Sequence, residues 1–123
     1  MNPSANFLSY NGTGLDSIKA RWLRDLINVT KTDFCSVQEH FKKNPGSFFK
    51  DNFTALDTYF IPAFREKERD TGRAKGGLAQ LNSTKYKLKK VRIPTKTFRL
   101  QAQVLHFPNT ILLWINSYFP TYC

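Results

Sequence analysis

The sequence predicts a mixed α/β (α+β) fold in which strands outnumber helices. Three observations predict it. The first 40 residues hold two strand-like runs with an amphipathic segment between them. From residue 78 onward, four further strand-like runs follow, each separated from the next by turn residues. The length of 123 residues suits one domain, and no linker, repeat or low-complexity segment divides the chain.

The N-terminal part has the pattern of a strand–helix–strand unit. Asn6–Asn11 alternates as a short strand does and ends at glycines, and Phe34–Val37 indicates a second, buried strand. Asp16 or Ser17 is expected to cap the intervening helix, which Lys31 and the next two residues close. The expected apolar stripe of this helix comprises Leu15, Ile18, Trp22, Leu23, Leu26 and Ile27. A unit of about 30 residues with this order pairs its strands in parallel.

The rest of the chain is predicted to be mainly strands. A looser region around residues 44–46 precedes a strand at Tyr59–Ile61, which Pro62 interrupts, and residues 65–75 form a charged loop. Pro108-Asn109 is expected to connect a hairpin. The four later strands are expected at Leu78–Leu81, Lys87–Ile93, Phe98–Phe107 and Thr110–Phe119.

Several residues are expected to be structural. Trp22 and Trp114 are interpreted as core residues, Cys35 as a small buried hydrophobe, and His40 as a structural histidine. Ile111–Ile115 is interpreted as a fully apolar core strand. One amphipathic helix cannot cover both faces of so many strands, so the chain is expected to be part of a larger fold with an exposed inter-sheet apolar face.

Charge and composition narrow the function classes. The chain carries 19 Lys and Arg against 9 Asp and Glu, a net charge of +10, and no acidic residue follows Asp70. This asymmetry favours a polyanionic partner such as nucleic acid, although a solvated basic surface is the alternative. The two cysteines are too few for a disulfide-stapled mini-protein. No apolar run is long enough for a membrane span and no signal peptide is recognisable, which favours a nuclear or cytoplasmic protein that is not secreted.

Two polar residues follow the strands of the N-terminal unit and form a candidate metal site. Asn11 ends the first strand and Glu39 follows the second. The carboxyl ends of parallel strands lie at the same edge of a sheet, where ligands bind, and carboxylate and carboxamide oxygens suit Mg²⁺. The alternative is that Asn11 is a turn residue and Glu39 a surface acid.

Two other segments are candidates for phosphate binding. Arg73 and Lys75 lie among the glycines of the segment 72–77, where the backbone can approach a phosphate or form a basic hairpin turn. Tyr118, near the end of the last predicted strand, could donate a hydrogen bond to a phosphate oxygen. Taken alone, Tyr118 is also typical of an ordinary aromatic at a sheet edge.

The order of these motifs resembles the endonuclease/exonuclease/phosphatase superfamily. The segments that carry the resemblance are Ser9-Tyr-Asn-Gly-Thr-Gly-Leu15, Cys35-Ser-Val-Gln-Glu-His40, Gly72-Arg-Ala-Lys-Gly-Gly-Leu78 and Ile115-Asn-Ser-Tyr-Phe-Pro-Thr121. The Gly-Arg-x-x-Gly-Gly form and the Gln-Glu-His triplet are most similar to the endonuclease domain of non-LTR retrotransposons. Apurinic-site repair endonucleases are similar as well.

The resemblance implies a fold and a set of residue roles. It implies a four-layer α/β sandwich of two mixed sheets flanked by helices, of which residues 1–123 match the N-terminal half. By this resemblance Glu39 and Asn11 would bind Mg²⁺ or Mn²⁺, with Asn11 orienting water and phosphate. Tyr118 would hydrogen-bond the scissile phosphate, and DNA would be the substrate, nicked to prime reverse transcription.

The sequence departs from the superfamily pattern in its later motifs. The Gly-Asp-x-Asn motif and the C-terminal Ser-Asp-His motif do not occur in the 123 residues. We therefore expect the chain alone to bind metal weakly, to be inactive and to be poorly soluble. Its expected partners are the missing C-terminal half of the domain and, in the intact protein, a downstream reverse transcriptase. The alternatives are an apurinic-site repair nuclease or a phosphatase of the same superfamily, and a non-catalytic basic nucleic-acid-binding fragment.

Overall fold

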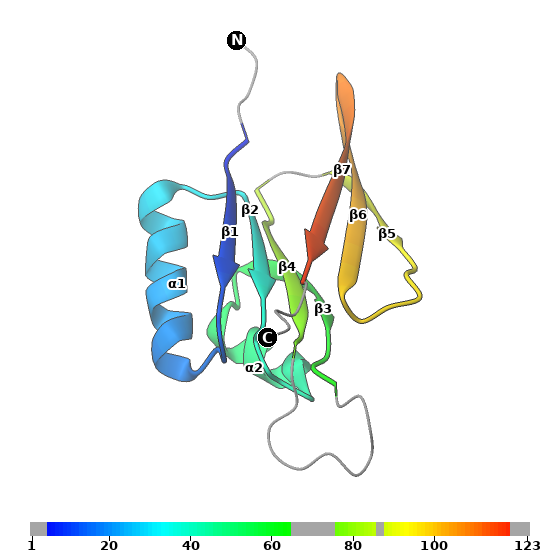
Figure 1. The fold of residues 1–123 in the computed structure, drawn as a ribbon. Helices are drawn as coiled ribbons and strands as arrows, with labels where there is room; N and C mark the ends of the chain where they lie inside the picture. The colour runs from blue at the N-terminus through cyan, green and yellow to red at the C-terminus, as the bar shows by residue number, and fades with distance from the viewer. Residues whose placement is uncertain (1–4, 65–75, 86–87, 119–123) are drawn as a thin grey trace.

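The computed structural model describes residues 5–64, 76–85 and 88–118, which form two helices and seven strands (Figure 1). The elements are, in chain order, β1 (Phe7–Asn11), α1 (Ser17–Thr30), β2 (Phe34–Gln38), α2 (Pro45–Asn52), β3 (Leu56–Ile61), β4 (Leu78–Ser83), β5 (Lys89–Ile93), β6 (Leu100–Phe107) and β7 (Thr110–Ser117). All of the predicted strands are present among these elements, with small differences at their ends.

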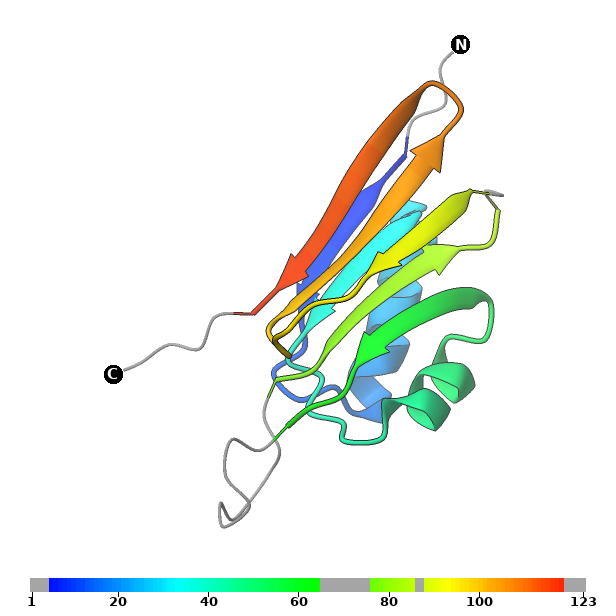
Figure 2. The same cartoon turned by 90° about the vertical axis from the view of Figure 1, so that its right-hand side faces the viewer.

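The strands form two sheets that pack face to face (Figure 2). The first sheet has the order β1-β2-β4-β3 and is mixed, because β1 and β2 are parallel while β4 is antiparallel to β2 and to β3. The second sheet, β5-β6-β7, is antiparallel. The expected parallel strand–helix–strand unit and the hairpin at Pro108-Asn109, where Phe107 pairs with Thr110, are both confirmed.

The helices cover the face of the first sheet that points away from the second sheet (Figure 1). Side chains from α1, α2, β2 and β4, together with one residue before α1 and one after α2, form the core there, namely Leu15, Ala20, Leu23, Ile27, Cys35, Val37, Phe49, Phe53, Ala79 and Leu81. At the start of α1, the Asp16 carboxylate accepts a hydrogen bond from the Lys19 N–H at 2.8 Å, which confirms the predicted cap. Lys31 ends the helix in a left-handed conformation.

The expected apolar stripe of α1 is only partly buried. Ala20, Leu23 and Ile27 face the sheet. Trp22 is 63% exposed, and Ile18 and Leu26 are also exposed, so the prediction that Trp22 belongs to the core is wrong. The helix carries apolar residues on more than one side, and spacing alone does not identify the side that meets the sheet.

The helix α2 was not predicted, because the region around residues 44–46 was expected to be loose. Pro45 occupies the first turn, where its fixed φ suits a helix. Phe49 and Phe53 are buried on the first sheet, and the ring of Phe49 stacks 5.8 Å from that of Phe53. Tertiary packing of these aromatic rings therefore stabilises a helix whose local sequence is a weak helix former.

The space between the two sheets is divided into an aromatic part and a polar part. At one end, Phe34, Leu105 and Trp114 form a buried cluster, in which the rings of Phe34 and Trp114 meet edge to face at 5.4 Å. Cys35 and Trp114 are buried as predicted. The Trp114 indole N–H donates to the Ser36 hydroxyl at 2.8 Å, so the one polar atom of this ring is satisfied.

The other part of the interface is built from side-chain amides. This set, called the carboxamide layer below, comprises Gln38, Gln80, Gln101, Gln103 and Asn116. Apart from Gln38, these side chains are at most 2% exposed. Among the described residues, no buried side-chain nitrogen or oxygen lacks a hydrogen-bond partner. The sheets are therefore joined by directional bonds as well as by apolar contact.

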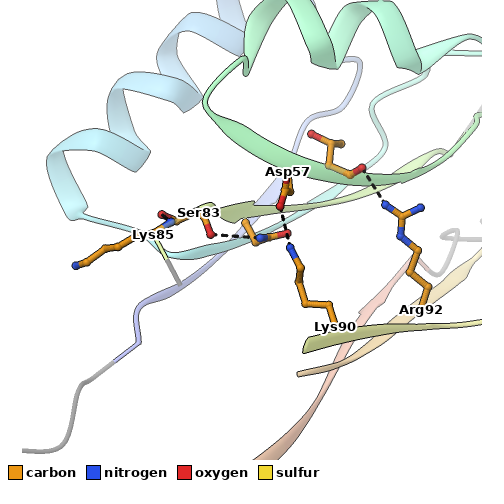
Figure 3. A network of polar contacts seen from close by, with 7 residues as sticks. Asp57, Ser83, Lys85, Lys90 and Arg92 are labelled. Atoms are coloured by element: carbon orange, nitrogen blue, oxygen red, sulfur yellow. Dashed lines mark hydrogen bonds and ion pairs between the residues drawn. The ribbon is translucent and has the colours of Figure 1, made fainter. Parts of the chain in front are cut away.

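A pair of cations joins the sheets at the edge formed by β3 and β5 (Figure 3). The Lys90 ammonium lies 2.9 Å from the Asp57 carboxylate. The Arg92 guanidinium donates to the Thr58 carbonyl at 3.5 Å and stacks 4.5 Å from the centre of the Tyr59 ring. These contacts are largely at the surface, so each contributes little to stability, on the order of 1 kcal/mol or less.

The apolar residues of β7 alternate between the two faces of the second sheet. Trp114 points inward and is 6% exposed, whereas Ile111, Leu113 and Ile115 are each more than half exposed. The interpretation of Ile111–Ile115 as a core strand is therefore wrong for the outer face of this strand, which is exposed. The exposed apolar face is the outer face of the second sheet, whereas the inter-sheet face, expected to be exposed, is packed. Helices and sheets of the described residues form three layers, and none of these helices is long and apolar enough to cross a membrane.

Candidate functional site

A polar groove of about 460 Å³ lies where strands of the two sheets end. It is lined by Ser9, Asn11, Ser36, Gln38, Glu39, Ile115, Asn116, Ser117 and Tyr118. The first five belong to β1 and β2 or follow β2 directly, and the last four belong to the end of β7 and the residue after it. The structure thus brings together Asn11, Glu39 and Tyr118, the three residues for which the sequence predicts catalytic roles.

Asn11 occupies the end of β1 and organises the turn that follows. Its side-chain oxygen accepts hydrogen bonds from the Thr13 N–H at 3.0 Å and from the Thr13 hydroxyl at 2.9 Å. Thr13 and Gly14 both have positive φ angles, of 43° and 83°. Because the oxygen already accepts two bonds inside the turn, the amide nitrogen of Asn11 is the atom better placed to meet a ligand.

Glu39 follows β2 in a left-handed conformation, with a φ of 57°. Such a conformation is uncommon for glutamate and persists because neighbouring segments hold the backbone. The Gly12 N–H donates to the Gln38 carbonyl and the Gly14 N–H to the Glu39 carbonyl, both at 2.8 Å. Among the described residues, no hydrogen bond or ion pair is made by the Glu39 carboxylate, and this half-buried side chain lines the groove.

The buried side chain of His40 anchors the loop that carries Glu39. It is fully buried, its Nδ1 accepts a hydrogen bond from the Lys42 N–H at 2.9 Å, and its Nε2 lies 3.0 Å from the Ile61 carbonyl. These partners require the neutral tautomer with the proton on Nε2. Burial lowers the pKa of His40 from 6.5 to about 4, so the ring is uncharged near neutral pH. The prediction that His40 is structural is confirmed.

Of the two glycines before β4, Gly77 leaves the space for the His40 ring, whereas a Cβ at Gly76 would meet the Phe64 ring. Gly76 and Gly77 have φ angles of 76° and 92°. The Gly77 carbonyl accepts from the His40 N–H at 3.4 Å, and the Gly76 carbonyl accepts from the Phe41 N–H at 3.0 Å. The glycine pair therefore supports the Glu39 loop. Arg73 and Lys75, the predicted phosphate-binding residues, lie outside the described residues.

The opposite wall of the groove is the end of β7. Asn116 is 2% exposed, and its side chain contacts both sheets. Tyr118, two residues later, is half-buried, and its N–H donates to the Arg99 carbonyl at 2.9 Å, which extends the pairing of β6 and β7. Tyr118 is thus held beside the groove by its backbone.

The donor atoms of the groove are of the kind that suits Mg²⁺ or Mn²⁺. These hard cations prefer carboxylate and other oxygen ligands, and Mg²⁺ is commonly held by one or two carboxylates together with water and substrate phosphates. Glu39 supplies one carboxylate, and Ser9 and Gln38 supply neutral oxygens. Within residues 5–64, 76–85 and 88–118, no group of three or more His, Cys, Asp or Glu side chains is arranged to hold a metal ion. A cation here would depend on Glu39.

Some lining residues were not identified as functional from the sequence. Gln38, Asn116 and Ser117 lie inside the motifs quoted for the superfamily resemblance, but no role was assigned to them. Their position within those motifs was the available signal. Ser9 and Ser36 lie inside those motifs as well, so the same signal was available for them.

The described residues thus form a mixed α/β fold with a polar groove where strands of its two sheets end. Two solved structures of this fold superpose on nearly the whole chain. The AP endonuclease LMAP from Leishmania major matches 93% of the chain with a TM-score of 0.69 and 14% sequence identity. The endonuclease domain of TRAS1, a telomere-specific non-LTR retrotransposon, matches 96% with a TM-score of 0.63 and 15% identity. The mixed α/β fold of two sheets that the sequence resemblance implies is confirmed.

The chain spans 40% of the length of the AP endonuclease and 47% of that of the retrotransposon domain. No protein-family model matches the sequence, and no curated protein matches it significantly. Because the sequence identities are 14% and 15%, the likeness to these two structures is a likeness of fold.

Proposed function

We propose that the chain is part of a divalent-metal-dependent DNA endonuclease of the retrotransposon type. The observation that carries this proposal is the convergence of Asn11, Glu39 and Tyr118 on one polar groove between the ends of two sheets. Glu39 lies more than 25 positions after Asn11 along the chain, and Tyr118 lies nearly 80 positions after Glu39. The types of these three residues match the roles that phosphodiester cleavage requires.

The residues of the groove would have different roles in binding the metal ion and the phosphate. Glu39 would hold Mg²⁺ or Mn²⁺, which supplies stabilisation of negative charge on the phosphate oxygens when bound. Asn11 would donate from its side-chain nitrogen to a phosphate oxygen, since its own oxygen is engaged by Thr13. Tyr118 would donate a phenolic hydrogen bond to the same phosphate. Arg73 and Lys75 would contact flanking phosphates.

The charge distribution supports DNA as the polyanion. From residue 71 to the end, the sequence contains no acidic residue. Among the described basic residues of this part, Lys85 follows β4 of the first sheet, and Lys89, Lys90, Arg92, Lys96 and Arg99 lie on or next to the second sheet, where Lys90 is paired with Asp57. Such an excess of positive charge attracts a phosphate backbone in a salt-dependent manner.

The proposal is tested by measuring how Mg²⁺ changes the affinity for DNA. Fluorescence anisotropy of a labelled duplex is recorded with the full chain in Mg²⁺ and in EDTA, over a series of salt concentrations. Wild type is expected to bind in EDTA and to bind more tightly in Mg²⁺. Glu39→Gln should lose the Mg²⁺-dependent gain and keep the salt-dependent binding, because the charge on the basic surface is unchanged.

A matched control separates Glu39 from a general loss of negative charge. Asp51 is an exposed carboxylate on α2, outside the groove, so Asp51→Asn should keep the full Mg²⁺ response. Retention of the Mg²⁺ response in Glu39→Gln, or its loss in Asp51→Asn, would contradict the proposed metal site. We expect negligible cleavage by the 123-residue chain, so robust Mg²⁺-dependent nicking by purified, nuclease-free protein would overturn that part of the proposal.

The second candidate is an apurinic-site repair nuclease, which the higher TM-score of 0.69 with an AP endonuclease favours. The same anisotropy measurement discriminates between the two, with a duplex that contains one abasic site beside an intact duplex of the same sequence. A retrotransposon-type domain should bind both alike. A clear preference for the abasic duplex that disappears in Glu39→Gln would favour the repair nuclease.

A further inference from the structure

We propose that Asn116 is a positioning residue that fixes the separation between Glu39 and Tyr118 across the groove. The inference rests on the proposed function for the role of that groove. The structural basis is that one buried side chain on β7 makes hydrogen bonds to β2, β4 and β6 at once. These bonds join both sheets at the edge where the groove opens.

The side-chain contacts of Asn116 use both ends of its carboxamide. Its nitrogen donates to the carbonyls of Val37 and Ala79, each at 3.0 Å, and to the Gln101 side-chain oxygen at 3.1 Å. Its oxygen accepts from the Gln38 side-chain nitrogen at 2.8 Å. Two N–H groups thus serve three acceptors, and the residue is 2% exposed. Buried and fully engaged amides of this kind fix geometry strongly.

The sequence positions of these bonds connect them to the groove. Gln38 directly precedes Glu39, and Asn116 lies two residues before Tyr118. The bond between Gln38 and Asn116 therefore joins the two walls of the groove close to Glu39 and Tyr118. The Gln101 side chain continues the connection, because its nitrogen donates to the Tyr59 carbonyl on β3 at 2.7 Å. A shift of β7 would have to break several of these bonds together.

The carboxamide layer itself supplies a matched control. Gln103 is 2% exposed, lies on β6, and donates to the Gln80 side-chain oxygen at 2.9 Å. It belongs to the same inter-sheet layer as Asn116 but does not line the groove. Replacement of Gln103 by leucine removes a buried amide of similar kind, so it reproduces the general cost of disturbing the layer without touching the connection between Gln38 and Asn116.

The test uses Mn²⁺ as a paramagnetic probe on the full ¹⁵N-labelled chain. Bound Mn²⁺ broadens nearby amide resonances, and the effect falls steeply with distance. In wild type, the amides of Glu39 and Tyr118 should both be broadened. In Asn116→Leu, the broadening at Glu39 should remain, whereas most of that at Tyr118 should be lost. In Gln103→Leu, both should remain. Unchanged broadening at Tyr118 in Asn116→Leu, or an equal loss in Gln103→Leu, would overturn the inference.

A further variant and a further measurement keep the test decisive if Asn116→Leu does not fold or if the chain does not bind Mn²⁺. If Asn116→Leu does not fold, Gln101→Leu removes another bond of Asn116 from a residue that does not line the groove, and it should also weaken the broadening at Tyr118. Residual dipolar couplings of backbone amides, recorded without metal, give the orientation of β6 and β7 relative to β1, β2 and β4. Absence of any Mn²⁺ effect near Glu39 would refute the proposed metal site, while an orientation unchanged in Asn116→Leu would refute the positioning role.

Discussion

The His40 ring occupies the space where a side chain at Gly77 would begin. A Cβ built on Gly77 would lie 2.7 Å from the Nε2 atom of His40, and closer still to Cε1 and Nδ1 of the ring. The φ of 92° at Gly77 is also unfavourable for any other residue. Because His40 follows Glu39 directly, this close approach links the glycine pair before β4 to the position of the Glu39 carboxylate.

Substitution of Gly77 should therefore be strongly destabilising. We expect Gly77→Ala to lower the free energy of unfolding by more than about 2 kcal/mol, since both the backbone strain and the ring contact oppose it. Gly46→Ala is the control, because its Cβ would meet only the Phe60 ring at ordinary contact distances of 3.5 and 3.9 Å. That change should be neutral or stabilising by up to about 1 kcal/mol. Urea denaturation measures both, and equal stabilities of the two variants would contradict the steric argument.

The buried neutral His40 should make stability depend on pH. Burial lowers its pKa from 6.5 to about 4, so the unfolded chain binds more protons than the folded chain between these values. The contribution is fully present above pH 6.5 and is lost as the pH falls toward 4, with a total on the order of 3 kcal/mol. Denaturation midpoints should therefore fall as the pH is lowered from 6.5 toward 4. His106→Gln leaves His40 in place and should show the same fall with pH. A His40 resonance that titrates near its ordinary pKa would contradict the prediction.

The two tryptophans should differ sharply in their contribution to stability. Trp114 is 6% exposed and donates to Ser36, whereas Trp22 is 63% exposed on α1. We expect Trp114→Ala to cost about 3–5 kcal/mol, and Trp22→Ala to change the stability by no more than about 0.5 kcal/mol. Chemical denaturation of the two variants compares them directly. Similar losses in both would show that Trp22 is covered in solution.

The thiol of Cys35 should be inert in the folded chain. Burial raises its pKa to about 12, so almost no thiolate is present near neutral pH. In a Cys123→Ser variant, where Cys35 is the one remaining cysteine, a thiol reagent should react only after addition of denaturant. Rapid stoichiometric labelling in native buffer would mean that the core between α1 and β2 opens readily.

Local sequence patterns predicted much of the fold, because they act over short distances. The strand–helix–strand unit followed from apolar spacing and from a cap at Asp16, and the hairpin at Pro108-Asn109 followed from turn chemistry. Asn11 and Glu39 could be placed together for the same reason, since parallel neighbours end at one edge of a sheet. The roles proposed for them, Glu39 toward the metal and Asn11 toward the phosphate, remain predictions.

The features that depend on tertiary contacts were not predictable in this way. The helix α2 depends on the burial of Phe49, and α1 does not reveal from spacing that Trp22 faces solvent. The apolar run at Ile111–Ile115 alternates between two faces, which a list of apolar residues cannot show. Glutamines are mostly surface residues, so the burial of Gln80 between the sheets had no local signal.

The most direct test of the groove as a metal and phosphate site is a map of Mn²⁺ relaxation over all amides of the full chain. Broadening should be strongest at the loops that carry Asn11 and Glu39 and at Tyr118 on the opposite wall, and it should disappear in Glu39→Gln. Broadening centred on surface acids outside the groove, such as Asp25 or Asp51, and unaffected by Glu39→Gln, would contradict the assignment of this groove as the site.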